Sequence, residues 1–161
     1  MSARAGIGYD SHRLAEGRRL VLGGVEIEEA ARGLAGHSDA DVLAHAAIDA
    51  LLGAAGLGDI GQHYPDSDER WRDADSLELL REVAGFLADH GWRVRHLDAT
   101  LLCEEPRLAP YRDAMRARLS EAMSLAPLEA NVKFTTGERM GFVGRGEGIA
   151  ALAIATVERM E

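Results

Sequence analysis

Apolar residues recur every three or four positions between residues 39 and 55, a spacing that places them on one face of a helix. They are Ala44, Ala47, Ile48, Leu51 and Ala55. The sequence SDAD at 38–41 is typical of a helix start, and Gly56 is typical of a helix end. Apolar spacing of the same kind predicts a second helix over 75–90, and we expect a third over 108–123.

Shorter apolar segments between these helices predict β-strands. The four predicted strands are 3–12, 92–103, 130–136 and 149–158. Residues 19–28 predict a hairpin, because Gly23 and Gly24 separate two apolar runs. The segment 56–74 is rich in Gly, Pro and Asp and predicts a long loop, and 137–148 predicts a glycine-rich turn region.

Length and charge narrow the class of protein. The 161 residues suit one domain, residues 1–161. Because strands and helices alternate in part, we expect an α/β fold of the α+β type, with a mixed β-sheet and helices on one face. A net charge of −9 disfavours nucleic acid and anionic membranes as partners. The single cysteine, Cys103, and an N-terminus without an apolar signal segment predict a cytoplasmic location.

A candidate metal site combines a strand and a helix. Asp10 and His12 are two positions apart in a predicted strand, so their side chains point to the same side. His45 lies among alanines, and a buried neutral histidine needs a metal or a carboxylate as partner. Such an Asp/His/His set leaves the fourth zinc position open, as in catalytic sites. Asp41 or Asp49 can orient the other ring nitrogen of His45. The alternatives are a strand-end turn at Asp10 and a capping role for Asp41.

Two further segments are candidates for phosphate binding. His37 and Ser38 lie at a helix N-terminus, where free N–H groups and the helix dipole suit a phosphate, although Ser38 can also act only as a cap. The other candidate is the glycine-rich segment 137–148 with the strand end before it, although such turns also form plain hairpins. Its polar residues are Thr135, Thr136, Glu138 and Arg145. Glu138 is a candidate ligand of Mg²⁺, and Arg145 is a candidate phosphate contact.

Three motifs occur together, and their combination is specific to one family. They are GYDSH at 8–12, HSDADVLAHAAIDALLGAAGLGDIGQHYPD at 37–66 and GFVGRGEG at 141–148. On these motifs the chain resembles 2-C-methyl-D-erythritol 2,4-cyclodiphosphate synthase from Gly6 to about Ala155. The resemblance implies a phosphorus–oxygen lyase of non-mevalonate isoprenoid biosynthesis. Metal-assisted attack of a 2-phosphate on a β-phosphate would convert 4-diphosphocytidyl-2-C-methyl-D-erythritol 2-phosphate to the cyclodiphosphate and CMP.

The resemblance also implies a homotrimer, with active sites between subunits, and roles for particular residues. The residues that match zinc ligands are Asp10, His12 and His45. Glu138 matches the ligand of a second ion, Mg²⁺ or Mn²⁺, and His37 and Thr136 match positions that stabilise the transition state. The positions that match substrate contacts are Asp10, Ser11, His12, His37, Ser38, Asp59, Ile60, Gly61, Tyr64, Pro65, Asp66, Ser67, Asp68, Cys103, Glu104, Glu105, Pro106, Arg107, Leu108, Ala109, Thr135, Thr136, Gly137, Glu138, Phe142 and Arg145.

The chain departs from the family pattern at Tyr64, Phe134 and Gly137, where Phe, a small residue and Thr or Asn are common. Two other functions are compatible with the same metal ligands. A zinc phosphohydrolase would use metal-bound water as the nucleophile. A metal-stabilised trimer without activity would serve interaction alone, but a structural zinc site normally has four protein ligands, which favours an enzyme.

Overall fold

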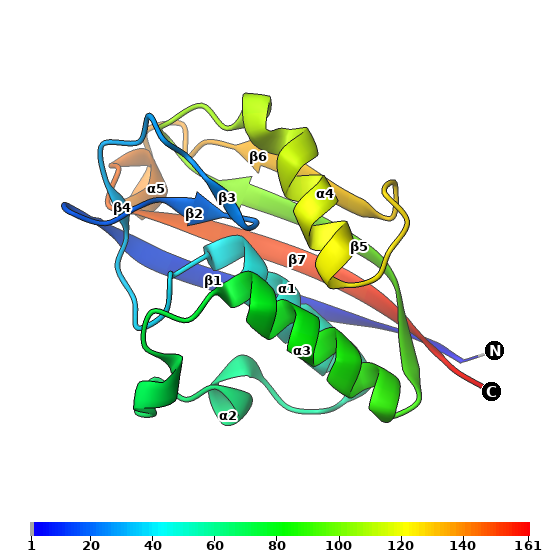
Figure 1. Ribbon diagram of the computed structural model, residues 1–161. Helices are drawn as coiled ribbons and strands as arrows, with labels where there is room; N and C mark the ends of the chain where they lie inside the picture. Colours follow the sequence, from blue (N-terminus) through cyan, green and yellow to red (C-terminus); the bar gives the residue numbers. More distant parts are fainter. Residues whose placement is uncertain (1) are drawn as a thin grey trace.

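The fold is built on one five-stranded β-sheet (Figure 1). The computed structural model describes residues 2–161. β7 pairs antiparallel with β1 and with β5, whereas β5 and β6 are parallel, so the sheet is mixed. Across the sheet the strands are β4 (Gly33–Leu34), β1 (Ala3–Ala15), β7 (Gly148–Arg159), β5 (Trp92–Leu102) and β6 (Ala130–Thr135).

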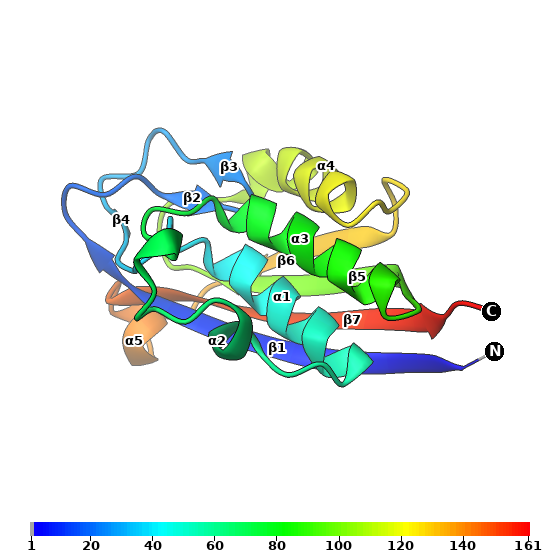
Figure 2. The same cartoon turned by 60° about the horizontal axis from the view of Figure 1, so that its bottom comes forward.

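Three helices cover one face of this sheet, as Figure 2 shows. They are α1 (Val42–Ala55), α3 (Ser76–Asp89) and α4 (Arg112–Ala122). The core between the two layers consists mainly of buried leucine, valine, isoleucine and alanine side chains. The expected class, a mixed sheet with helices on one face, is confirmed. Within residues 2–161, no helix has both the length and the apolar character needed to cross a membrane.

Caps set the bounds of the helices. The Asp41 side chain accepts hydrogen bonds from the first turn of α1, and Gly56 ends that helix with a left-handed φ of 73°. The Asp75 side chain caps α3 in the same way. The predicted helix over 108–123 is divided, because Pro110 has no N–H to donate and lies in the short 3₁₀ helix η2 (Ala109–Tyr111) before α4 begins.

Short helices occupy parts of the segments predicted to be loop or turn, which corrects those predictions. α2 (Ile60–His63) is supported by a capping box between Asp59 and Gln62. The other two are η1 (Glu69–Trp71) and α5 (Gly141–Gly144). Helices of a single turn owe their stability to capping and tertiary contacts, so apolar periodicity does not reveal them.

The predicted hairpin over 19–28 is confirmed as β2 (Val21–Leu22) and β3 (Val25–Glu26). β4 was not predicted, because it has only two residues and exists by pairing with Leu14 and Ala15 of β1. It brings the chain before α1 to the end of β1.

Two glycines of β1 allow α1 to lie directly on the strand. A Cβ atom at Gly8 would lie 1.9 Å from the carbonyl oxygen of Ala46, and one at Gly6 would lie 2.2 Å from that of Ala50. Both distances are far below van der Waals contact, so only glycine fits at this approach. Because α1 packs so closely on β1, a side chain of α1 can meet side chains of β1 that point to the same face.

The opposite face of the sheet carries exposed apolar side chains near its middle. Ile7 of β1 pairs with Ile154 of β7, and Tyr9 pairs with Leu152. These four side chains are between 40% and 70% exposed. We call the patch formed by these four residues the open sheet face.

Candidate active site

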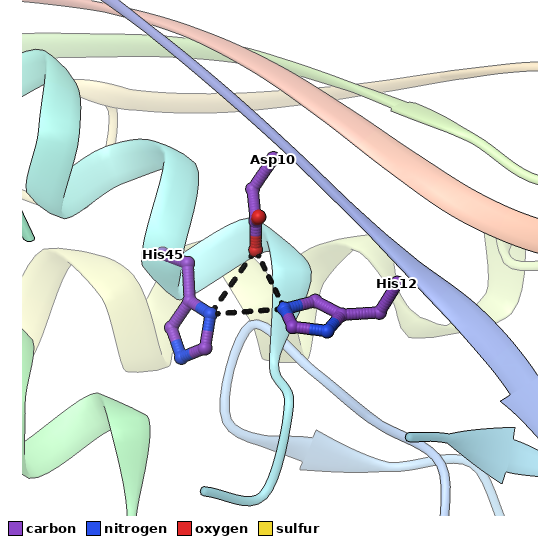
Figure 3. A group of neighbouring side chains, drawn as sticks. All are labelled: Asp10, His12 and His45. Carbon is purple, nitrogen blue, oxygen red and sulfur yellow. Dashed lines mark hydrogen bonds and ion pairs between the residues drawn. The ribbon is translucent and has the colours of Figure 1, made fainter. Parts of the chain in front are cut away.

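Asp10 and His12 from β1 and His45 from α1 converge on one point (Figure 3). Oδ2 of Asp10 lies 2.9 Å from Nε2 of His12 and 3.1 Å from Nδ1 of His45. The two ring nitrogens are 3.3 Å apart. The structure thus brings together the three residues that the sequence indicated as metal ligands.

The chemistry of these three atoms suits a metal ion. His12 donates its Nδ1–H to the carbonyl oxygen of Ala35 at 2.9 Å, so Nε2 of the neutral ring presents a lone pair to Asp10. Nδ1 of His45 faces the same point. A carboxylate oxygen and two ring nitrogens in mutual contact repel one another unless a cation lies among them. Two imidazoles and a carboxylate are ligands that zinc accepts, and three protein ligands leave a fourth position open.

The electrostatics of the cluster also favour a cation. Burial opposes ionisation of Asp10, but hydrogen bonds from His12 and His45 in their protonated forms, together with their charges, lower the pKa of Asp10 to about 2. Burial lowers the pKa of His12, yet the hydrogen bond and charge of Asp10 outweigh it and raise that pKa above the usual value. The charge of Asp66 adds to this rise. Asp10 is therefore an anion throughout the neutral range and attracts either a proton or a metal to His12.

The orienting role considered for Asp41 and Asp49 is wrong, since neither carboxylate is hydrogen-bonded to the His45 ring in residues 2–161. The buried Asp41 carboxylate turns back to the helix start and accepts from four backbone N–H groups, those of Gly23, Gly24, Leu43 and Ala44. Asp49 accepts from the N–H of Ile60 at 2.8 Å and so anchors α2 on α1. The nearest contact of His45 Nε2 is instead Ser76 Oγ, at 2.8 Å.

Residues 37–38 lie beside the metal cluster and contact the segment 59–68. Ser38 Oγ lies 3.2 Å from His45 Nε2, and His37 donates its Nε2–H to the carbonyl oxygen of Asp68 at 3.0 Å. Asp59 caps α2, and Tyr64 donates its hydroxyl to Glu82 at 3.0 Å. The bond between His37 and Asp68 thus joins the end of the predicted substrate loop to the segment that contacts His45.

A cavity of about 800 Å³ brings together two other predicted segments. Cys103–Ala109 lines it together with Thr135 and Thr136. Burial raises the pKa of the Cys103 thiol to about 11, so this side chain is a neutral part of the wall. Arg112 and Phe134, which lie next to these two segments in the chain, also line it. The other lining residues come from a distant region with no sequence signal for a site: Leu14, Glu29, Ala30, Ala31 and Arg32.

The segment after this cavity wall is exposed. Thr136 Oγ1 accepts from the N–H of Glu138 at 3.2 Å, and the Glu138 carboxylate points to solvent. Arg145 is ion-paired with Glu147 at 3.1 Å, and Phe142 is 37% exposed. The structure does not bring any of these side chains into the Asp10 cluster.

The departures from the family pattern have local explanations. A Cβ at Gly137 would lie 2.5 Å from the backbone N of Gly144, so this turn has no room for a larger residue. The guanidinium of Arg112 lies over the ring of Phe134 at 5.0 Å in the cavity wall. Tyr64 packs edge-on against Trp71, and its extra hydroxyl is the group that reaches Glu82.

The sequence of this chain matches the model of a known protein family. The model of the YgbB family matches residues 3–158. This chain belongs to the YgbB family. Among curated relatives of this YgbB-family chain, the 2-C-methyl-D-erythritol 2,4-cyclodiphosphate synthase of Syntrophomonas wolfei is 56% identical over 97% of this chain and 99% of its own length. The family resemblance that the three motifs indicated is confirmed.

Other relatives are longer. The bifunctional enzyme IspD/IspF of Anaeromyxobacter dehalogenans is 60% identical over 96% of this chain, which spans only 39% of that relative's length. The structure of the bifunctional IspDF from Campylobacter jejuni matches with a TM-score of 0.95 and 39% identity, over 99% of this chain and 43% of that one. A 2C-methyl-D-erythritol-2,4-cyclodiphosphate synthase in its CDP-bound form matches with a TM-score of 0.87 and 38% identity, over 96% and 100% of the two chains.

Proposed function

We propose that this YgbB-family chain converts 4-diphosphocytidyl-2-C-methyl-D-erythritol 2-phosphate to 2-C-methyl-D-erythritol 2,4-cyclodiphosphate, with release of CMP. The observation that carries the proposal is the convergence of Asp10, His12 and His45 on one point, in a chain similar over 97% of its length to a synthase of that name. A cytoplasmic location belongs to the proposal, because the free thiol of Cys103 suits a reducing compartment.

The metal ions of the proposal are zinc at the Asp10 cluster and Mg²⁺ or Mn²⁺ near Glu138. When bound, zinc would polarise a phosphate oxygen and the second ion would offset the charge of the diphosphate. Because nucleophile and target belong to one substrate, the main task of the protein is to hold that substrate folded back on itself.

The chain offers a separate group for each part of the substrate. The cavity lined by Cys103–Ala109 is large enough for a nucleoside, and Thr135 and Thr136 at its edge can donate hydroxyl groups to phosphate oxygens. His37 and Ser38 lie beside the metal cluster and can hold the 2-phosphate. The loop over 59–68 would contact the erythritol part.

We also propose that the chain forms a homotrimer with shared active sites. The residues of the metal cluster do not line the nucleoside-sized cavity, so a site shared between copies would join two separate surfaces. The open sheet face supports an oligomer, because contiguous exposed apolar patches on a soluble chain mark interaction surfaces. Cyclic symmetry lets every copy use the same patch.

The activity is tested by incubating the protein with the diphosphocytidyl substrate, zinc and magnesium, and recording phosphorus NMR of the products. The expected result is a cyclic diphosphate together with CMP, in equal amounts. An open-chain phosphate would identify a zinc phosphohydrolase instead. Zinc binding without any turnover would leave only a metal-stabilised interaction protein.

The assembly is tested by light scattering of two matched variants. Ile154→Lys places a charge on the open sheet face, whereas Leu128→Lys places one on an apolar side chain that is 79% exposed in the loop before β6. We expect three chain masses for the unmodified protein and for Leu128→Lys, and smaller, inactive species for Ile154→Lys. A fully active monomer would contradict the shared site.

A further inference from the structure

His45 has a second contact, on the side of its ring opposite Asp10 and His12. Its Nε2 lies 2.8 Å from the hydroxyl oxygen of Ser76, the first residue of α3. The Ser76 hydroxyl donates a short hydrogen bond to Oδ1 of Asp39, and the Ser76 N–H donates to Oδ2 of Asp39 at 3.1 Å. The Ser76 side chain is completely buried. A chain of hydrogen bonds therefore runs from the His45 ring to a carboxylate.

The direction of each hydrogen bond follows from the groups involved. The Asp39 carboxylate also accepts from the N–H of Asp41 at 3.1 Å, so it acts throughout as an acceptor. The single hydroxyl proton of Ser76 is therefore donated to Asp39. Ser76 Oγ can then only accept from His45, which places the proton of the neutral ring on Nε2. Nδ1 is left with its lone pair, facing Asp10 and His12.

We propose that Ser76 and Asp39 are positioning residues for His45. They hold its ring in the Nε2–H tautomer and turn Nδ1 toward the metal site, as outer partners of metal-bound histidines do in other proteins. This inference rests on the metal centre of the proposed function and adds two residues that do not touch the metal.

Apart from His45, the groups around the Ser76 hydroxyl keep their other hydrogen-bond partners when this hydroxyl is removed. Without it, Asp39 keeps two N–H donors, from Asp41 and Ser76, and the start of α3 keeps its Asp75 cap. The group that would lose its nearer partner is Nε2–H of His45. Its remaining neighbour, Ser38 Oγ, is more distant at 3.2 Å and also accepts from the N–H of Ala40. Ser76→Ala should therefore fold and should affect the metal ligand.

The first experiment measures zinc affinity by competition with a chelator, without substrate. Ser76→Ala is expected to weaken zinc binding by about 10- to 100-fold, the usual effect of losing an outer partner of a metal ligand. Ser120→Ala is the matched control, because Ser120 is also a buried helix serine and its hydroxyl has no hydrogen-bond partner within residues 2–161. The control should bind zinc as the unmodified protein does. A loss smaller than threefold in Ser76→Ala overturns the inference.

The second experiment reads the tautomer directly, by ¹⁵N NMR of histidine-labelled protein. In the unmodified protein the His45 proton should reside on Nε2, with zinc on Nδ1. Asp39→Asn introduces an amide that can donate to Ser76, so the Nδ1–H tautomer should gain population in the zinc-free form. Zinc on Nε2 of the unmodified protein, or an unchanged tautomer in Asp39→Asn, contradicts the inference.

The two experiments also separate this inference from the proposed function. If the unmodified protein binds no zinc, the metal centre of the proposed function is wrong and the positioning role falls with it. If it binds zinc and turns over substrate while Ser76→Ala binds zinc equally well, only the positioning role is wrong.

Discussion

The Asp10 cluster and the Glu138 segment are both candidate metal sites, and they differ in how completely one chain builds them. The ligand atoms of Asp10, His12 and His45 lie within 3.3 Å of one another, and each histidine has a hydrogen-bond contact on its far ring nitrogen. Glu138 is exposed, and among residues 2–161 its hydrogen bonds are to Thr136 alone. A preformed site binds its ion without reorganising, whereas an exposed carboxylate needs further ligands from substrate or water.

This difference leads to a general expectation for the two ions. Zinc should bind to the protein alone, because all three ligands are already in place. The second ion should bind together with the diphosphate, whose oxygens complete its coordination. Variants of the first site should therefore change metal content, and variants of the second should change only the metal response of turnover.

The largest expected effect is that of His45→Ala. Removing one of three ligands should abolish stoichiometric zinc binding and lower turnover by at least about 100-fold, because the metal supplies several kcal/mol of charge stabilisation. Metal analysis and turnover assays check both outcomes. His90→Ala is the control, since His90 is an exposed histidine at the end of α3. Full zinc retention in His45→Ala would remove His45 from the ligand set.

The sequence predicted the components of the first site because their signals are local. Asp10 and His12 share a strand face, and His45 stands out as a polar residue in an apolar helix. Ser76 could not be predicted as the partner of His45, because 31 residues separate them and only the packing of α3 beside α1 brings them together. Asp41 was assigned two possible roles, and only the structure shows that its carboxylate serves the backbone.

The larger elements of the fold could also be predicted, and the smaller ones could not. The bounds of α1 and α3 follow from residues with strong capping preferences, Asp41, Gly56 and Asp75. β4 and the Glu29–Arg32 wall of the cavity depend on pairing and packing between distant segments. Such contacts leave no periodic pattern in the chain.

The second largest effect is a loss of zinc affinity on acidification. Zinc competes with the proton on His12, and the pKa of His12 is raised in the zinc-free protein. Below that raised pKa His12 is protonated, so the affinity for zinc falls as pH falls. The fall is about tenfold per pH unit for each proton displaced. Asp10, with a pKa of about 2, stays ionised and does not contribute in this range. Zinc titrations between pH 5 and about 8, where histidines titrate, check the slope. A constant affinity across that range would exclude His12 as a ligand.

Gly8→Ala is expected to have a moderate effect on the first site. The added Cβ would lie 1.9 Å from the carbonyl oxygen of Ala46, so α1 must move away from β1 and carry His45 with it. Overpacking of this kind costs about 1–3 kcal/mol of stability. Gly85→Ala in α3 is the matched control, because nothing lies within 4 Å of its added Cβ, and it should stabilise the helix by about 0.5–1 kcal/mol. The temperature of thermal unfolding and the zinc affinity should both fall for Gly8→Ala. Neither should fall for the control.

The smallest effect on metal content, and the sharpest test of the comparison, comes from Glu138→Gln. This change keeps the size of the side chain and removes its charge. Zinc content should stay the same, because Glu138 lies outside the Asp10 cluster. Turnover should fall by about tenfold, close to 1.4 kcal/mol, and more magnesium should be needed to reach half the maximal rate. Hard divalent ions prefer carboxylate and phosphate oxygens as ligands. The loss of the Glu138 charge should therefore slow the step in which negative charge develops on the departing CMP.

The control for Glu138→Gln is Glu121→Gln, which removes the charge of another exposed carboxylate, on α4. It matches the change in net charge and should leave turnover and the magnesium response as they are. Three outcomes are informative for Glu138. Unchanged turnover with an unchanged magnesium response would reduce it to a turn residue. Lost zinc would mean that the two sites share this ligand in the assembled protein. Slower turnover with intact zinc and a weaker magnesium response would show that Glu138 serves the second ion and does not serve zinc.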